Sequence, residues 1–168
     1  MELRHMAVAF LINEKNEALF LQKKKDAAFL PGYLVPIGGH LEQNEMSDPK
    51  QACYREIEEE TGIDRDDIKD LSLKYIVHRL KGLEEIRIQY VFFGTVHKGM
   101  TLKQSDEGTL NWVDLTYVDT YFVSETTSEI VHHYLADRPR SNDIYIGTMY
   151  QDKAVPVMNW SVLQDWEK

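Results

Sequence analysis

The chain has 168 residues and a formal net charge of −9, with 43% hydrophobic and 28% charged residues. This length and balance predict one globular domain spanning residues 1–168. The negative charge disfavours a polymeric nucleic acid as partner, and no apolar run reaches the roughly 20 residues of a membrane-spanning helix. Cys53 is the one cysteine, so no intrachain disulfide can form. We therefore expect a cytoplasmic protein without a membrane partner, acting as a monomer or a homodimer.

The first part of the chain predicts a β-hairpin followed by an irregular segment. Met6–Asn13 and Ala18–Lys23 are apolar stretches of strand length, and a polar turn lies between them. Asp26–Pro36 contains the turn pair Pro31-Gly32, so we expect no regular element there.

The segment from Asp48 to Gly62 carries the clearest helix signals. Asp48 suits the N-cap position, because its carboxylate can accept hydrogen bonds from free backbone N–H groups. Pro49 suits the first helical position, and Gln51 completes a capping-box pattern. Gly62 suits a left-handed cap at the C-terminal end.

The remaining elements suggest a mixed sheet flanked by two helices, an α/β (α+β) fold. Residues rich in β-branched and aromatic side chains predict strands over Leu71–His78, Ile86–Val96 and Leu110–Leu115. Helical spacing predicts a second helix over Glu125–Ala136. Asp143–Tyr150 and Ala154–Asn159 predict a final hairpin turning at Gln151–Lys153.

Three glutamates lie on one face of the first predicted helix. Glu56, Glu59 and Glu60 are spaced i, i+3, i+4, whereas Glu58 points roughly the other way. Carboxylates so close together repel one another unless a cation offsets the repulsion, and Mg²⁺ prefers oxygen ligands. Arg55 is placed to brace one of them. The alternative is a solvated acidic face, the usual fate of such a run.

The sequence around these glutamates resembles the signature of the Nudix hydrolase family. That signature is Gly, five residues, Glu, seven residues, then Arg-Glu-apolar-x-Glu-Glu-x-Gly-apolar. Gly39 and Glu45 have the family spacing, and residues 55–63 match every fixed position of the second half. Nine residues rather than seven separate Glu45 from Arg55. We expect the two extra residues at Met46-Ser47, where they lengthen the loop and leave the helix register intact.

The resemblance implies a Nudix-type α/β/α sandwich, with the mixed sheet between helices and the C-terminal hairpin as an addition. It also implies hydrolysis of a nucleoside diphosphate-type linkage with Mg²⁺, or alternatively Mn²⁺, as cofactor. Glu56 is our first choice for the water-activating base and Glu59 the second. Arg55 and Glu45 are expected to hold the glutamates in position. The implied metal ligands are Gly39, Glu56, Glu59, Glu60 and Glu107.

The whole chain is most similar to the MutT-like branch, and particularly to oxidised purine nucleoside triphosphate diphosphatases. Lys23 ends the second predicted strand where that group carries basic residues near phosphates, although a surface lysine is an equal alternative. Glu107 resembles an extra metal-binding glutamate of that group; the alternative is an exposed loop residue. Val35 is expected to contact substrate, but it stands where relatives that read an oxidised purine carry Asn. Arg79 and Arg87 flank a predicted turn, and nothing in the sequence selects them as substrate contacts.

These features leave three functions open. The leading one is hydrolysis of a small nucleoside triphosphate such as 8-oxo-dGTP to the monophosphate and pyrophosphate. The second is a pyrophosphatase acting on a nucleotide sugar or a dinucleoside polyphosphate. The third is a Nudix-fold sensor that binds a nucleotide without cleaving it.

Overall fold

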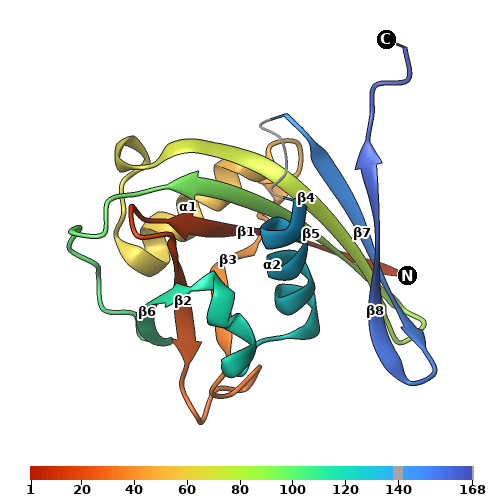
Figure 1. Ribbon diagram of the computed structural model, residues 1–168, viewed down its shortest axis with the longest axis horizontal. Helices are drawn as coiled ribbons and strands as arrows, with labels where there is room; N and C mark the ends of the chain where they lie inside the picture. Colours follow the sequence, from red (N-terminus) through yellow and green to blue (C-terminus); the bar gives the residue numbers. More distant parts are fainter. Residues whose placement is uncertain (138–141, 168) are drawn as a thin grey trace.

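The structure is a computed structural model that describes residues 1–137 and 142–167. In this part of the chain a mixed sheet of eight strands has a helix on either face (Figure 1). The strands are β1 (Glu2–Ile12), β2 (Glu17–Lys23), β3 (Leu34–His40), β4 (Lys69–Lys81), β5 (Glu85–Thr95), β6 (Gly108–Asp114), β7 (Ile144–Asp152) and β8 (Val155–Leu163). The helices are α1 (Pro49–Thr61) and α2 (Glu125–Asp137), with short 3₁₀ helices η1 (Gln43–Glu45), η2 (Arg65–Asp67) and η3 (Leu115–Thr120). No described helix is long and apolar enough to cross a membrane.

The sheet has the strand order β6-β2-β3-β1-β5-β4-β7-β8. β1 runs parallel to β5 and β4 runs parallel to β7, while the other neighbouring strands are antiparallel. The C-terminal hairpin β7–β8 thus extends the sheet beyond β4 (Figure 1). The predicted mixed sheet and the predicted extra hairpin are both confirmed.

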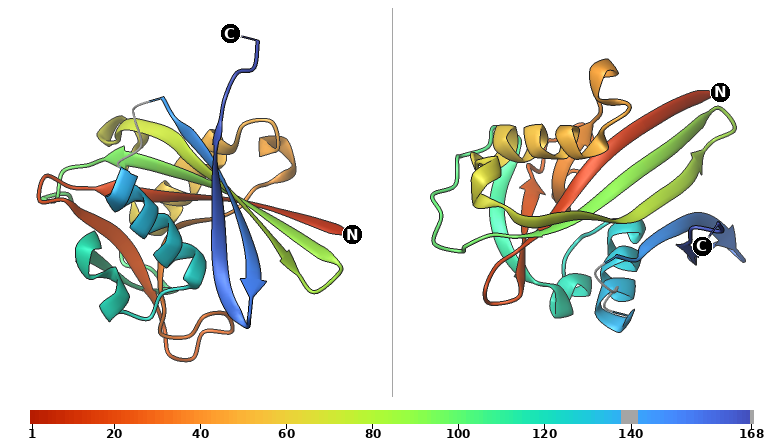
Figure 2. Two further views of the ribbon diagram at one scale, coloured as in Figure 1. Left: turned by 45° about the vertical axis from the view of Figure 1, so that its right-hand side comes forward. Right: turned by 90° about the horizontal axis from the view of Figure 1, so that it is seen from above.

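Alternation along β1 separates two hydrophobic cores, because successive strand side chains point to opposite faces. Ala7 and the other residues on the same face of β1 pack with Ile57 of α1. Val8 and Phe10 belong to the other core, which contains Ile130 of α2. The two helices therefore cover opposite faces of the sheet, as Figure 2 shows.

The ends of α1 follow from its sequence. The Asp48 carboxylate accepts a hydrogen bond from the Gln51 backbone N–H at 3.3 Å, and Pro49 opens the helix. Gly62 takes the left-handed conformation at φ 74° and donates its N–H to the Glu58 carbonyl. The Gln51 side chain accepts from Arg65 at 3.5 Å. The Asp48 cap is thus confirmed, while the Gln51 side chain has a different partner from the one that a capping box gives it.

Several boundaries differ from the sequence-based expectation, among them those of β3 and of the last hairpin. The end of Asp26–Pro36 is not irregular, because β3 begins at Leu34 and continues to His40. Pro and paired Gly residues weaken a strand on their own, but β3 is held between β1 and β2 by antiparallel pairing on both sides. In the last hairpin the turn lies at Lys153–Ala154, both at positive φ, so β8 begins at Val155 and runs on to Leu163.

Candidate active site

A cavity of about 750 Å³ lies beside β3 and is lined by residues from both sides of the sheet. Its wall includes Val77, which belongs to the core under α2. It also includes Glu56 and Glu60 of α1, the helix on the other face. Gly38 and Gly39 line the cavity between them, and the absence of a side chain at Gly39 leaves room for the Glu56 carboxylate.

The contact between β3 and the first of these glutamates is close. A Cβ atom on Gly39 would lie 2.7 Å from the carboxylate carbon and both carboxylate oxygens of Glu56. Gly39 does not have a positive φ, so its role is to provide space and not backbone freedom. Glycine at this position therefore sets where the Glu56 carboxylate lies.

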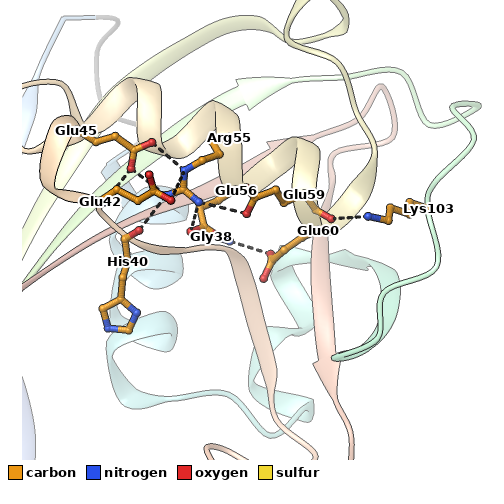
Figure 3. Close-up of polar contacts among 9 residues, drawn as sticks. All are labelled: Gly38, His40, Glu42, Glu45, Arg55, Glu56, Glu59, Glu60 and Lys103. Carbon is orange, nitrogen blue, oxygen red and sulfur yellow. Dashed lines mark hydrogen bonds and ion pairs between the residues drawn. The ribbon is translucent and has the colours of Figure 1, made fainter.

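Arg55 is the centre of a charged network at the start of the site (Figure 3). Its guanidinium donates to both carboxylate oxygens of Glu45, at 2.8 and 2.9 Å. It also donates to Glu56 at 2.8 Å, to Glu59 at 3.2 Å and to the His40 carbonyl at 3.0 Å. One cation thus links the loop after β3 to two carboxylates of α1.

The two-residue excess before α1 leaves this network intact. Glu45 ends η1, and Asp48 caps α1 three residues later, so Met46-Ser47 lies in the short connection between the helices. Glu45 is 5% exposed and still meets Arg55 in a two-point ion pair. Glu45 and Arg55 thus meet despite the longer spacing, and the place of the two extra residues stays a prediction.

The deeper glutamates of α1 are held in a partly dehydrated environment. Burial is the main cause that raises the pKa of Glu60 to about 7. The nearby Glu56 and Glu107 carboxylates contribute to this rise, and one hydrogen bond from the Gly38 N–H at 3.0 Å opposes it. Burial also raises the pKa of Glu56, although Arg55 opposes that shift. The carboxylate charges are therefore incompletely compensated at this end of the cavity.

Lys23 and Glu107 meet close enough to Glu60 to affect its charge. The Lys23 ammonium contacts a Glu107 carboxylate oxygen at 2.7 Å, and both side chains line the cavity. Glu107 precedes β6, which pairs with β2 so that Gly108 lies opposite Lys23. Val35 of β3 also lines the cavity. The structure thus brings Lys23, Val35 and Glu107 to the predicted site; their roles there remain predictions.

A model of the NUDIX domain family matches residues 3–139 of this chain. The chain belongs to the Nudix family. A MutT protein from Bacillus halodurans has 24% sequence identity and a TM-score of 0.71, with 95% of this chain and 97% of that chain covered. A MutT protein from Methanosarcina mazei Go1 has 22% identity and a TM-score of 0.68, covering 83% and 97% of the two chains. A C. elegans Ap4A hydrolase has 16% identity and a TM-score of 0.60, covering 82% and 98%.

A search of curated proteins finds no match. The family model nevertheless covers most of the chain, and the structural neighbours share its fold. The protein is therefore a Nudix hydrolase, a member of a family that acts on nucleoside diphosphate-linked substrates and generally uses a divalent metal.

The Nudix glutamates offer suitable oxygen ligands, yet other groups hold them in this structure. Within residues 1–137 and 142–167, no three His, Cys, Asp or Glu side chains are gathered closely enough to hold a metal ion. Arg55 binds Glu56 and Glu59, and the Gly38 N–H binds Glu60. Half-buried carboxylates with raised pKa values fit a hard cation, because a positive charge would stabilise their ionised forms. The residues fit Mg²⁺ in chemistry, and binding requires the glutamates to turn from their present partners.

Glu59 is the predicted ligand that differs most from the others. Its side chain is 59% exposed and does not line the cavity, although it contacts Arg55. Its carbonyl accepts a hydrogen bond from Lys103 at 3.3 Å (Figure 3). Sharing a helix face with Glu56 and Glu60 therefore does not give it equal access to the cavity.

Sequence reasoning missed most of the far wall of the cavity. β4 and β5 supply Arg79 and Arg87, Ser124 lies just before α2, and Thr127 lies in its first turn. The two arginines were visible as residues flanking a turn, but strand pairing is what brings them together. Phe29, 53% exposed and outside the core, also lines the cavity.

Proposed function

We propose that this Nudix hydrolase is a Mg²⁺-dependent nucleoside triphosphate diphosphatase. It cleaves a phosphoanhydride bond of a small nucleotide and releases the nucleoside monophosphate and pyrophosphate. The leading substrate is an oxidised guanine nucleotide such as 8-oxo-dGTP. Mn²⁺ can replace Mg²⁺ in this proposal.

The observation that carries the proposal is that charged side chains gather at one end of the cavity. Glu56 and Glu60 lie at one end with Gly39, and the Lys23–Glu107 ion pair is close enough to interact electrostatically with Glu60. A volume of about 750 Å³ is within the range of small-ligand sites, and its remaining wall includes apolar side chains from several strands. A phosphate chain is expected at the carboxylate end and a nucleoside in the remaining volume.

Each residue of the carboxylate end has a distinct part in the proposed reaction. The divalent cation would be held by Glu56, Glu59, Glu60, Glu107 and the Gly39 carbonyl. When bound, the cation polarises phosphoryl oxygens and lowers the pKa of a water molecule. Lys23 moves from Glu107 to a substrate phosphate, and Arg55 with Glu45 keeps the α1 carboxylates in register.

Glu56 is the favoured general base over Glu59. It lines the cavity, its carboxylate is packed against Gly39, and burial raises its pKa above the ordinary value. A raised pKa brings a carboxylate closer to the operating pH, where it is a more effective proton acceptor. Glu59 is more exposed and lies outside the cavity wall.

The part of the cavity expected to hold the base does not by itself select an oxidised guanine. Val35 lines the cavity and has no polar group with which to read an oxidised purine. A pyrophosphatase acting on a nucleotide sugar or a dinucleoside polyphosphate is therefore the second candidate, because a cavity that also reaches Arg79 and Arg87 offers space beyond one base.

The test is a hydrolysis screen of ordinary and oxidised nucleoside triphosphates with Mg²⁺ and identification of the products. Glu56→Gln is expected to lower kcat by about 10²–10⁴-fold, the usual contribution of a positioned general base. Glu58→Gln removes the same charge from the exposed side of α1 and is the matched control. It should retain wild-type turnover.

Three outcomes separate the candidates. Pyrophosphate release from a nucleoside triphosphate, lost in Glu56→Gln and kept in Glu58→Gln, supports the proposal. Preferential cleavage of a nucleotide sugar or a dinucleoside polyphosphate supports the second candidate instead. Tight nucleotide binding with no turnover across the panel contradicts both and supports a sensor.

A further inference from the structure

The β4–β5 hairpin forms one wall of the cavity, and two arginines lie opposite each other in that wall. Arg79 of β4 and Arg87 of β5 are paired in register, and both line the cavity. Lys81, two residues after Arg79, lines it as well. Like charges placed directly opposite in a sheet are destabilising. Cations concentrated at one site in a chain of net charge −9 therefore call for a specific explanation.

Nearby carboxylates neutralise this cluster only in part. Glu85 forms ion pairs with Arg87 and with Arg4, which lies beside Arg87 on β1, so one carboxylate serves two arginines. Glu2 pairs with Arg4 alone. The Arg79 side chain forms no hydrogen bond and no ion pair with any of the described residues.

The local environment makes the charge on Arg79 costly. Burial lowers the pKa of its guanidinium below the ordinary value, Arg87 lowers it further, and Glu85 only partly opposes these effects. Arg87 in turn lies 5.9 Å from the centre of the Phe29 ring, which shields one side of it. An anion placed between the two guanidinium groups would relieve both the desolvation and the repulsion.

The arginine pair lies at a distance from the carboxylate end of the cavity. Gly38 of β3 and Val91 of β5 both lie in register with Val8 of β1, and Arg87 precedes Val91 by four residues. Four residues of strand span about 13 Å, and crossing two strands adds about 10 Å sideways, so the backbones are about 16 Å apart. Arginine side chains shorten that gap, and a nucleoside can bridge what remains.

We propose that Arg79 and Arg87 form a second phosphate-binding site, which selects nucleotides that carry a phosphate on the ribose in addition to the phosphate chain at the glutamates. The orientation of the substrate in this inference rests on the proposed function. A neutral base edge would accept hydrogen bonds from the guanidinium groups but would leave their charge uncompensated. A phosphate monoester supplies both the charge and the oxygen pairs that planar guanidinium groups bind in bidentate fashion.

Binding by non-hydrolysable ligands tests the site without turnover. Adenosine 5′-monophosphate is compared by calorimetry with adenosine 2′,5′-bisphosphate and adenosine 3′,5′-bisphosphate, none of which contains a phosphoanhydride. The wild-type protein should bind at least one bisphosphate about 10- to 100-fold more tightly than the monophosphate, the range expected for hydrogen bonds between charged partners. Arg79→Gln and Arg87→Gln should each abolish most of that difference.

Two further variants separate a phosphate site from a general loss of positive charge. Arg79→Lys keeps the charge but not the planar donor pair, so it should retain an intermediate preference for the bisphosphate. Lys69→Gln removes a cation from the exposed start of β4, outside the cavity, and should behave like the wild-type protein. Equal affinity of the wild-type protein for the monophosphate and both bisphosphates would overturn the inference, as would full preference retained in Arg79→Gln.

Hydrolysis then distinguishes this inference from the proposed function. Nucleoside 5′-triphosphates with and without a ribose phosphate are compared in the presence of Mg²⁺. Arginine-dependent bisphosphate binding without any triphosphate cleavage would refute the diphosphatase proposal and leave the second phosphate site standing. Cleavage of both triphosphates at equal kcat/KM, unchanged in Arg79→Gln, would refute the second site and leave the diphosphatase.

Discussion

Replacing Gly39 with alanine tests how tightly β3 controls the Glu56 carboxylate. The new Cβ would lie 2.7 Å from three atoms of that carboxylate, whereas ordinary contacts begin at 3.4 Å. The carboxylate must therefore retreat by at least about 0.7 Å, and Arg55, which binds it at 2.8 Å, must follow or lose the contact. A misplacement of about 1 Å at a catalytic centre can cost about 10²-fold in rate. We expect kcat of Gly39→Ala to fall by about that factor.

The fold itself should tolerate this substitution. Gly39 does not have a positive φ, so alanine introduces no backbone strain, and the displaced atoms belong to the end of a flexible side chain. Gly38→Ala provides the contrast: at φ 146° its Cβ would lie 2.1 Å from the Ala7 carbonyl oxygen, so it should disrupt the β1–β3 pairing. Gly99→Ala is the matched control, because Gly99 lies in a loop outside the cavity wall.

The assay combines Mg²⁺-dependent turnover with thermal unfolding for each alanine variant. Loss of turnover in Gly39→Ala, with a melting temperature close to that of Gly99→Ala, supports the role of Gly39 as space for the carboxylate. Unimpaired turnover in a folded Gly39→Ala protein would refute the reasoning.

Three other substitutions test the electrostatics of the site. Glu45→Ala removes the two-point partner of Arg55 and should lower the free energy of unfolding by about 2 kcal/mol at pH 7 in denaturant titrations. Because the Arg55 contact holds the pKa of Glu45 below its ordinary value, the difference from wild type should disappear as the pH falls below that pKa. A difference that does not change with pH would contradict this cause. Glu60 has a pKa raised from 4.5 to about 7, so between these pH values the folded wild type binds more protons than the unfolded chain and loses stability as pH rises. With metal chelated, Glu60→Gln should be about 2 kcal/mol more stable than wild type at pH 8 and equal to it below pH 4. Equal stability of the two proteins at both pH values would count against a buried carboxylate. Arg79→Gln relieves repulsion from Arg87 and should raise the melting temperature in the absence of ligand; a clear decrease would show that the arginine stabilises the fold instead.

The parts of the fold that local rules determine were accessible from the sequence. The cap at Asp48, proline at the first helical position and Gly62 at the end defined α1 because each acts within a few residues. The family resemblance also predicted that Arg55 and Glu45 hold the α1 glutamates, and the two residues meet although nine residues rather than seven separate them.

Features that depend on pairing between distant segments were not accessible in the same way. β3 contains a proline and two glycines, and only its two neighbouring strands reveal it as a strand. Helical spacing placed Glu59 beside Glu56 and Glu60, but the packing of α1 against the sheet leaves Glu59 exposed. The arginine pair depends on the β4–β5 register, which the sequence around the turn suggests but does not determine.

The proposed hydrolysis requires a divalent cation to bind between the Gly39 carbonyl and the glutamates of α1. A crystal structure of the protein soaked with Mn²⁺, with the metal located by its anomalous scattering, measures this directly. We expect a peak about 2 Å from oxygens of Glu56 and Glu60 and from the Gly39 carbonyl, with Glu56 turned from Arg55. A peak elsewhere, or no peak in crystals whose glutamates keep their contacts with Arg55 and Gly38, would contradict the account.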